Sequence, residues 1–518
     1  MAAGRRTWVA SVFSLGIFVL WLLGRRLNLH TSFKTNKRLF EKRILVAVPF
    51  QKAVQSKDKM KDTGVSIVYT KPHKFFDLSR TTYIKELSVP SPKATQQIVI
   101  PKPTTPNIAH LFTPHRTEPL PSRCVYKETP NLDLLRGHEP QVWQNVAKRT
   151  IMVFSAFLDS RKEIGGRVIR VLASGKQARF GHSGKVSCVL WLQQDSNIVG
   201  VPTDASYEVI YESRLHPSMY TAHFIMCKLR TVGASAESIL GVSVVPDVCG
   251  IISNTLKVIK SKPYLAQNNT FSICLSPIYG NYDNTPAIIE HIEMHKILGV
   301  ERITVYVLSV GPNVGSILQQ YQKEGLVDLV KWRYPYSKVL CDYFAQREAL
   351  NDCLYRNMGR TRYLAVVDLD EIITPRKTLV WDAMMTRLHK PERAAYLFQH
   401  AYFLNMQPKN SKPTMLTQTV FSRPSEVFPP GKIRCKSIYE MEKTVQVNIH
   451  FPDTLLAGVQ EYIVPAEEAM LHHYRSEVMQ IFHDGRKNFT YIKDTYMVNY
   501  ANRIRKAFSD RINMFNIE

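Results

Sequence analysis

Short apolar runs alternate with stretches of helical periodicity through the second half of the chain. Strands are expected at 271–277, 303–308, 327–332, 363–367 and 394–403, and helices at 286–298, 314–323, 342–357 and 379–388. This alternation predicts the α/β class, with right-handed crossovers and a mostly parallel sheet. Near the end of the chain Ile504, Phe508, Ile512 and Phe515 recur at helical spacing, which predicts an amphipathic helix packed on that core.

A different pattern precedes this region. Between residues 150 and 263 the apolar runs are short and are separated by Gly, Ser and Asp, as is typical of strands. Examples are Ile151–Phe157, Arg167–Leu172, Val186–Leu192 and His223–Leu229. The pattern predicts a small β-sandwich-like unit or an elaborated edge of the following domain.

The beginning of the chain is read as an anchor and a spacer. Trp8 to Leu23 is an uncharged run between arginine pairs, and no small-x-small cleavage site follows it. This favours an uncleaved signal-anchor helix over a cleaved signal peptide. The next hundred or so residues are rich in Pro and Lys, as in an extended spacer. We therefore expect a cytoplasmic tail at 1–7, a transmembrane helix at 8–24, a stem at 25–145, a β-rich segment at 146–265 and an α/β domain with its C-terminal helix at 266–518.

The orientation of this anchor is indicated by two opposing signals. Basic residues after the apolar run outnumber those before it, which by the positive-inside rule would leave the large domain in the cytosol. Two sequons, at Asn268 and Asn488, would be used only in a lumen. Since the charge rule weakens when a long domain follows, we expect a single-pass type II protein with a lumenal domain.

The net charge of +25 does not by itself indicate nucleic acid. Neither zinc-finger spacing nor an RNP-like strand nor a recognition-helix pattern is present in the sequence, so no nucleic-acid partner is expected. Eight cysteines form no Cys-x-x-Cys pair, which argues against a zinc ribbon. The sequence does not determine how the cysteines pair in disulfides or whether the protein self-associates.

The strongest chemical signal is a cluster of acids directly after an apolar run. Tyr363–Val367 reads as a buried central strand, and Asp368, Asp370 and Glu371 follow it. Ligands of open α/β sheets bind beyond the carboxyl ends of the strands. Because Asp368 and Asp370 share one face of an extended chain, they are suited to Mg²⁺ or Mn²⁺ carrying a diphosphate. The alternative is an ordinary strand-end turn with solvated acids.

The order of elements resembles the nucleotide-sugar-binding GT-A fold, and several landmarks resemble glycosyltransferase family 92. They are Phe154–Phe157, Cys188, Ser276–Gly280, Glu290–Glu293, Tyr363–Ile373 and His473-Tyr474. The resemblance covers roughly residues 150 to 515. It implies a metal-dependent galactosyltransferase of the Golgi membrane that uses UDP-galactose and Mn²⁺ (or Mg²⁺) to build β linkages on glycans. A bird member forms Galβ1-4Gal and worm members act on core fucose; this chain is more similar to vertebrate sequences.

The resemblance also implies roles for individual residues. Asp370 would bind the metal directly, and Asp368 would bind it through water or hold the ribose or diphosphate. His473, with His472 as the rival, would complete the metal shell. Tyr279 and Gly280 are placed to contact the base or ribose of UDP, with a plain turn as the alternative.

Inversion at the sugar requires a carboxylate that accepts the proton of the attacking hydroxyl. The resemblance points to Glu440 as this base, with Glu442 and Glu426 as alternatives. One alternative is a different class of function, a catalytically idle, membrane-anchored carbohydrate-binding protein. Another is a transferase that uses a different nucleotide sugar or a different acceptor, such as core fucose. A sulfotransferase is disfavoured because Pro277–Gly280 is a poor phosphate-cradling loop.

Overall fold

The computed structural model describes Tyr126 and the ranges 132–137, 141–148, 150–176, 185–210, 219–229, 235–261, 264, 269–405, 415–428, 435–475 and 490–515. Within these ranges we find no helix with both the length and the apolar character needed to cross a membrane. The expected cytoplasmic tail, the transmembrane helix at 8–24, most of the stem, and both sequon asparagines, Asn268 and Asn488, lie outside the described residues.

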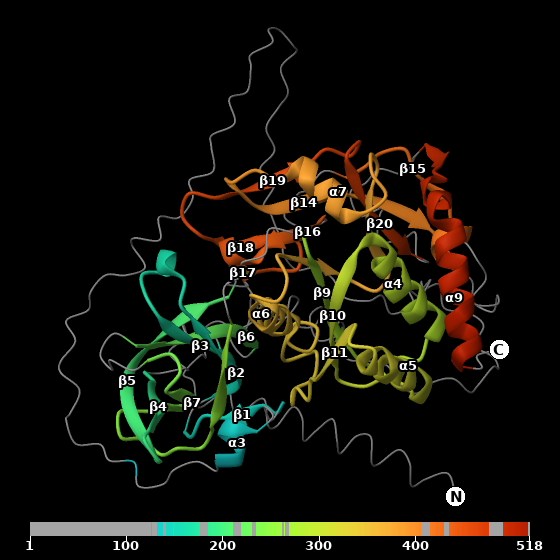
Figure 1. Ribbon diagram of the computed structural model, residues 1–518. Helices are drawn as coiled ribbons and strands as arrows, with labels where there is room; N and C mark the ends of the chain where they lie inside the picture. The colour runs from blue at the N-terminus through green and yellow to red at the C-terminus, as the bar shows by residue number, and fades with distance from the viewer. Residues whose placement is uncertain are drawn as a thin grey trace, which may run out of the picture. The chain divides into compact units, whose positions relative to one another are not determined.

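The β-rich segment forms a closed sheet. In the described part of the chain its strands are β1 (Gln144–Asn145), β2 (Ile151–Asp159), β3 (Val168–Lys176), β4 (Ser187–Gln194), β5 (Asn197–Val209), β6 (Tyr220–Lys228), β7 (Ile239–Val245) and β8 (Leu256–Lys260). The order is β1-β2-β3-β6-β5-β4-β7-β8, and β8 also pairs with β2. This pairing closes β2 to β8 into a ring (Figure 1), so the unit is a barrel and not the expected sandwich. Closure pairs the edges that a sandwich would leave open.

The described part of the barrel segment also contains two small helices and the disulfide between Cys188 and Cys227. The α-helix α3 (Leu132–Arg136) contacts β7 and β8, and the 3₁₀ helix η2 (Lys162–Ile164) lies between β2 and β3. The disulfide Cys188–Cys227 links β4 to β6, which are separated by β5.

The second sheet carries the acid-tipped strand in its middle. Its strands are β9 (Phe271–Ile278), β10 (Val300–Val307), β11 (Val327–Lys331), β12 (Tyr363–Val367), β13 (Glu371–Pro375), β14 (Arg393–Leu404), β16 (Cys435–Glu440), β19 (Gln460–Val464) and β20 (Ala469–Arg475). The order is β11-β10-β9-β12-β16-β14-β20-β13, with β19 beside β14. The first four strands run parallel, as the alternating pattern predicts. The sheet as a whole is mixed, because β16 pairs antiparallel with both β12 and β14.

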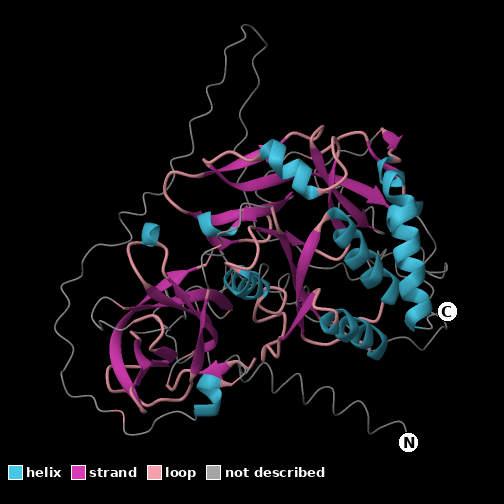
Figure 2. Cartoon of the chain, in the orientation of Figure 1, coloured by secondary structure: helices cyan, strands magenta, loops and turns pink. Residues whose placement is uncertain are grey.

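Helices cover both faces of this sheet (Figure 2). They are α4 (Thr285–Leu298), α5 (Pro312–Lys323), α6 (Gln346–Asn357), α7 (Trp381–Leu388), α8 (Leu416–Thr419) and α9 (Ala501–Phe515), with the 3₁₀ helices η4 (Met441–Lys443) and η6 (Tyr496–Tyr500). Among the described residues two short antiparallel pairs, β15 (Ser422–Pro424) with β21 (Tyr491–Lys493) and β17 (Thr444–Val447) with β18 (Pro452–Leu455), complete the domain. One apolar cluster holds α4, α5, α7 and α9, and a second holds α6 together with barrel strands.

The ends of α4 follow from its sequence. The side chain of Asn284 accepts a hydrogen bond from the Ala287 N–H at 3.2 Å and so caps the first turn. The helix ends at Gly299, whose φ of 102° lies in the left-handed region that glycine adopts without strain. Pro286 lies in the first turn, as expected. The predicted closing helix is confirmed too, since Ile504 of α9 is buried in the cluster that contains α4.

The helix α6 begins later than its pattern predicts. We expected a helix over 342–357, whereas α6 starts at Gln346. The three residues before it, Tyr343, Phe344 and Ala345, all have positive φ, which is incompatible with a right-handed helix. The sequence pattern does not predict these positive φ values, because none of the three residues is glycine.

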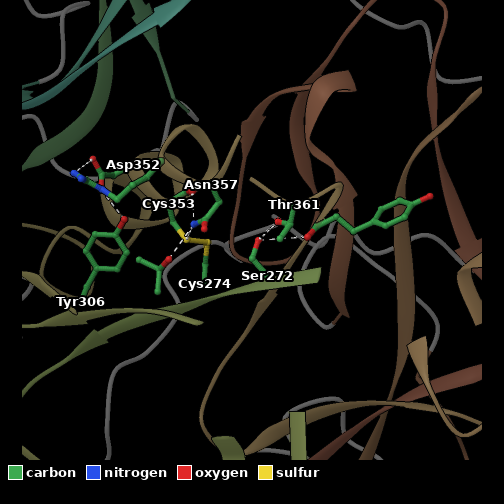
Figure 3. The surroundings of a disulfide bond; sticks show 10 residues. Ser272, Cys274, Tyr306, Asp352, Cys353, Asn357 and Thr361 are labelled. Carbon is green, nitrogen blue, oxygen red and sulfur yellow. Dashed lines mark hydrogen bonds and ion pairs between the residues drawn. A yellow bond between two sulfur atoms is a disulfide. The ribbon is translucent and has the colours of Figure 1, made fainter. Parts of the chain in front are cut away.

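A disulfide ties α6 to the sheet (Figure 3). Cys274 of β9 is bonded to Cys353 of α6, and the Asn357 side chain donates to Thr304 Oγ1 at 2.9 Å. The neighbouring Asp352 accepts hydrogen bonds from Tyr306 of β10 and Ser155 of the barrel. The helix is therefore fixed against both the central strands and the barrel.

Candidate active site

The acids predicted to carry the chemistry lie at the carboxyl ends of the parallel strands. The strand β12 is buried along its whole length and pairs in parallel with β9. Asp368 follows its last residue, and Tyr279 follows β9 at the same edge. This edge is where an open α/β sheet binds ligands.

Both carboxylate oxygens of Asp368 are engaged. Oδ1 accepts a hydrogen bond from Ser276 Oγ at 2.8 Å, and Oδ2 lies 2.8 Å from Lys436 Nζ. Gln346 Nε2, at the start of α6, donates in turn to Ser276 Oγ at 2.6 Å. Burial alone would raise the pKa of Asp368, but the Lys436 ammonium and the hydrogen bonds hold that pKa well below its usual range. Asp368 is therefore an ionised, fixed carboxylate.

A buried ammonium group lies between two of the acids. The Lys436 side chain is 1% exposed, and its Nζ is 3.3 Å from Glu371 Oε2 as well as 2.8 Å from Asp368. Burial would lower the pKa of Lys436, but the two carboxylates raise it above its usual range. Burial raises the pKa of Glu371, and the adjacent ammonium counteracts this effect. A positive charge is thus built into the cluster, which the sequence reading did not identify.

The structure brings Asp370 and His473 together. Strands β13 and β20 are antiparallel neighbours with Glu371 opposite His473, and the Tyr474 N–H donates to the Asp370 carbonyl at 2.8 Å. His473 Nε2 lies 3.1 Å from Asp370 Oδ2. The Asp370 side chain is 42% exposed, whereas the imidazole is 6% exposed. Asp370 is therefore the exposed member of this pair.

The other ring nitrogen of His473 is held by buried partners. Nδ1 lies 3.2 Å from Glu371 Oε1 and 2.7 Å from His400 Nε2, and the two imidazoles stack at 4.8 Å between centroids. Arg475 Nε donates to His473 Nε2 at 2.8 Å, which makes Nε2 the acceptor. Burial and the adjacent His473 lower the pKa of His400, so His400 is neutral.

The rival histidine points elsewhere. Consecutive residues of a strand alternate between faces, and His472 stacks on Phe403 at 4.3 Å between ring centroids. Its Nδ1 lies 3.4 Å from the Tyr474 hydroxyl, and burial lowers its pKa to about 3. His472 is therefore a neutral core histidine, and His473 is the one beside Asp370.

Tyr279 and Gly280 lie at the same edge as the acids. The Tyr279 ring packs on Phe344 at 4.6 Å between centroids. Burial, and then the negative charge of Asp368, raise the pKa of Tyr279. Gly280 has a φ of 76°, and a Cβ placed on it would meet nothing within 4 Å. The glycine is thus required by the turn and opens onto free space.

The structure does not bring Glu440 to this cluster. Glu440 lies opposite Tyr363, the first residue of β12, whereas Asp368 follows the last residue of that strand. The Glu440 carboxylate pairs with Arg362 at 3.2 Å and with Lys443 at 2.8 Å. The reason is the antiparallel register of β16, which puts Cys435 and Lys436 at the acidic edge and Glu440 at the opposite one. Its position makes Glu440 a structural ion-pair partner.

The two alternative bases lie at different ends as well. Glu442 accepts a hydrogen bond from the Tyr264 N–H at 3.2 Å, and η4 places it directly after the Glu440 end of β16. Glu426 is exposed and lies two residues before Phe428. The Phe428 backbone exchanges hydrogen bonds of 2.9 and 3.0 Å with that of His400, which contacts His473. Of Glu426, Glu440 and Glu442, Glu426 is therefore the one at the same end of the sheet as the acidic cluster.

The donor set fits a divalent cation. Glu371, His400 and His473 offer ligand atoms within 4.8 Å of one another, and Asp370 faces the outer nitrogen of His473. His473 Nε2 and Asp370 Oδ2 converge at 3.1 Å, as two ligands of one cation would, and Arg475 Nε lies 2.8 Å from the same nitrogen. A metal-binding imidazole whose other nitrogen is held by a carboxylate is the usual arrangement of such sites.

The chain is similar in sequence to proteins of a known family. The family model described as Glycosyltransferase family 92 matches residues 269–511. The Caenorhabditis elegans protein named Glycosyltransferase family 92 protein C33H5.2 is 22% identical over 267 residues, which are 48% of this chain and 50% of that protein. The C. elegans Beta-1,4-galactosyltransferase galt-1 is 29% identical over 106 residues, which are 20% of this chain and 25% of that protein.

Among solved structures, the match to S. aureus TarS 1-349 covers 48% of this chain and 72% of that chain, at 13% identity and with a TM-score of 0.22. The matched segments span half or less of the curated relatives named above. The fold and the acidic edge define a mixed α/β domain of the kind that binds ligands at its strand ends. The family match supports a glycosyltransferase function, and specifically glycosyltransferase family 92, for residues 269–511.

Proposed function

We propose that this chain transfers galactose from UDP-galactose to a galactose-terminated glycan of glycoproteins, with inversion to a β1-4 linkage. The observation that carries the proposal is the convergence of Asp370 and His473 at the carboxyl end of β12. The choice of galactose and of the linkage is supported by the similarity to the relative named a beta-1,4-galactosyltransferase.

Asp370 and His473 are the residues that would hold Mn²⁺ or Mg²⁺. Such an ion, when bound, stabilises the negative charge that develops on a departing diphosphate. Glu371 and His400 contact Nδ1 of the imidazole and so leave its Nε2 on the side of Asp370. Asp368 has both oxygens occupied by Ser276 and Lys436, so it acts in this proposal as a holder of the donor and not as a direct ligand.

The ammonium of Lys436 adds a fixed positive charge beneath the donor site. Together with Asp368 and Glu371 it forms a cluster of mutually paired charges. Fixed charges of this kind are effective in catalysis because they do not have to reorganise during the reaction. Tyr279 and Gly280, at the end of β9, are the proposed contacts of the UDP base or ribose.

In the reaction itself, the acceptor hydroxyl oxygen forms a bond with the anomeric carbon of galactose. The bond from that carbon to the β-phosphate oxygen breaks, and UDP leaves with the electron pair. The hydroxyl proton passes to a carboxylate on the acceptor side. We assign this role to Glu426, since its segment runs past His400 while Glu440 lies at the other end of the sheet.

The proposal includes a location. The expected signal anchor at 8–24 and the sequons at Asn268 and Asn488 support a single-pass type II Golgi membrane protein with its catalytic domain in the lumen. Occupied sequons, read from a mass shift after endoglycosidase treatment, would agree with this orientation.

The test uses the chain purified from a secretory host. UDP release is followed with UDP-galactose, UDP-glucose and UDP-N-acetylglucosamine over a galactose-terminated glycan, with Mn²⁺ and with EDTA. Release that needs UDP-galactose, metal and Asp370 supports the proposal, and Glu467→Gln, an exposed carboxylate, is the charge control. Glycan binding without UDP binding or turnover would instead indicate the idle carbohydrate-binding protein.

A further inference from the structure

The loop between β11 and α6, residues 332–345, ends in a strained backbone. Tyr343, Phe344 and Ala345 have φ values of 41°, 57° and 64°. Residues other than glycine rarely adopt a positive φ, and three such residues in succession are energetically costly. Strain of this kind persists where the surrounding structure over-determines it, and it concentrates at ligand-binding positions.

Several contacts hold this turn in place. The indole N–H of Trp332 donates to the Phe344 carbonyl at 2.8 Å, and the Gln346 N–H donates to the Asp342 carbonyl at 3.1 Å. The Phe344 ring is packed on Tyr279. The turn is therefore fixed to the end of β9, so the residue at its tip, Tyr343, has a defined position.

The turn lies beside the carboxylate cluster. Gln346 directly follows it and is hydrogen-bonded to Ser276, which is bonded in turn to Asp368. Burial, and then the charges of Asp342, Tyr279 and Asp368, raise the pKa of Tyr343, which agrees with this placement. Yet Tyr343 is 54% exposed. An aromatic side chain is thus presented to solvent at the edge of the donor site.

Neighbouring residues give this surface a mixed character. Val339 and Leu340 of the same loop are 67% and 37% exposed, which adds apolar area. The Asp342 carboxylate lies 2.6 Å from Arg347 Nη1, is 31% exposed and precedes Tyr343 in the chain. A carboxylate disfavours a diphosphate but accepts hydrogen bonds from hydroxyl groups. The combination suits a neutral ligand with an apolar face and many hydroxyls.

We propose that Tyr343 is the platform on which the terminal hexose of the acceptor glycan stacks, with Asp342 accepting hydrogen bonds from its hydroxyls. This assignment rests on the proposed transferase function and adds the acceptor subsite to it. The C–H face of a pyranose ring packs on an aromatic ring, as apolar ligand faces generally do in binding sites. In this assignment the nucleotide contacts Tyr279, whose ring packs on the other aromatic residue of the turn, Phe344.

The test compares Tyr343→Ala, Tyr343→Leu and Tyr343→Phe in the full chain. Acceptor KM is measured with a galactose-terminated glycan at saturating UDP-galactose, and UDP affinity is measured by calorimetry with Mn²⁺. We expect the Ala and Leu variants to raise the acceptor KM at least tenfold, while the UDP Kd stays within twofold. The Phe variant keeps the ring, so its KM should stay within twofold of the native value.

Two outcomes would overturn the assignment. A UDP Kd that rises in step with KM would place Tyr343 in the nucleotide site, and an unchanged KM in the Ala variant would leave it without a ligand. Failure of the transferase proposal is seen separately, as a native protein that neither binds UDP nor turns over. In that case glycan binding is measured directly by surface plasmon resonance, and its loss in Tyr343→Ala still decides the question.

Discussion

The ammonium nitrogen of Lys436 lies 2.8 Å from Oδ2 of Asp368, in a position where the lysine side chain is 1% exposed. The two residues come from adjacent strands, β16 and the end of β12, so the ion pair joins the central strands at the acidic edge of the sheet. Removing one member of a buried pair leaves the other charge uncompensated, which costs far more than a surface pair contributes.

We therefore predict that Lys436→Met lowers the free energy of unfolding by about 3–5 kcal/mol, because Asp368 and Glu371 lose their shared cation. Urea denaturation measures this change. Lys443→Met is the matched control, since Lys443 is 22% exposed and pairs with Glu440. It should cost about 1 kcal/mol or less. Equal losses in the two variants would show that Lys436 is no more than a peripheral ion-pair partner.

His400→Ala should weaken Mn²⁺ binding by about 10- to 100-fold, because the imidazole of His473 loses one of the two groups that orient it. Isothermal calorimetry with Mn²⁺ reads this effect independently of turnover. His389→Ala is the control, because His389 lies near Glu440, at the other end of β12. An unchanged Mn²⁺ affinity in His400→Ala would mean that Glu371 alone fixes the ring.

Glu426→Gln and Glu440→Gln separate catalysis from stability. If Glu426 accepts the acceptor proton, its amide variant should reduce kcat by about 10²- to 10⁴-fold. Glu440→Gln should leave kcat unchanged and lower the unfolding free energy by about 1 kcal/mol, because the ion pair with Arg362 is weakened. A large loss of kcat in Glu440→Gln, with Glu426→Gln normal, would reverse the assignment.

The pH dependence of stability should show a contribution from Glu348. Burial raises the pKa of this carboxyl, which accepts a hydrogen bond from Ser174, from 4.5 to about 7. The folded state then keeps its proton at a pH where the unfolded chain has lost it. Its contribution to stability is therefore fully present below about pH 4.5 and is lost as the pH rises to about 7.

Glu348→Gln removes this titration. The fall in the unfolding free energy between pH 5 and 7 should therefore be about 2–3 kcal/mol smaller in this variant. Chemical denaturation at several pH values provides the measurement. Glu467→Gln, which removes an exposed carboxylate, serves as the comparison. A decline of the same slope in the Glu348→Gln variant would show that other groups carry it.

Periodicity predicted the parallel half of the sheet well, for a physical reason. Strands such as Tyr363–Val367 are buried on both faces, so their sequence is a continuous apolar run that is easily recognised. The antiparallel returns were harder, because β16 contains Lys436 and Glu440 and does not look like a central strand. The barrel was missed as a barrel because ring closure depends on the pairing of β2 with β8, about a hundred residues apart.

Some residues of the candidate site were likewise predictable from the sequence and others were not. Asp370 and His473 were expected to cooperate, and β13 and β20 pair so that they meet. His400 and Lys436 stand in no recognisable motif, and only the register of their strands brings them to the acids. Glu440 was chosen by resemblance, and the antiparallel direction of β16 carries it to the opposite end of β12. Strand direction, which spacing alone does not encode, decides which side chains share an edge.

The pairing of β13 with β20 determines when this site can assemble during synthesis and folding. His473 follows Asp370 by 103 residues, and Lys436 follows Asp368 by 68, so no local segment contains the cluster. At a synthesis rate of about 5–20 residues per second, Asp370 leaves the ribosome on the order of 5–20 s before His473. Contacts between such distant residues also form slowly, because long loops must close first. The acids at the tip of β12 therefore spend part of biosynthesis without their cationic and imidazole partners, and the cluster is completed only when the last strand of the central sheet has been inserted.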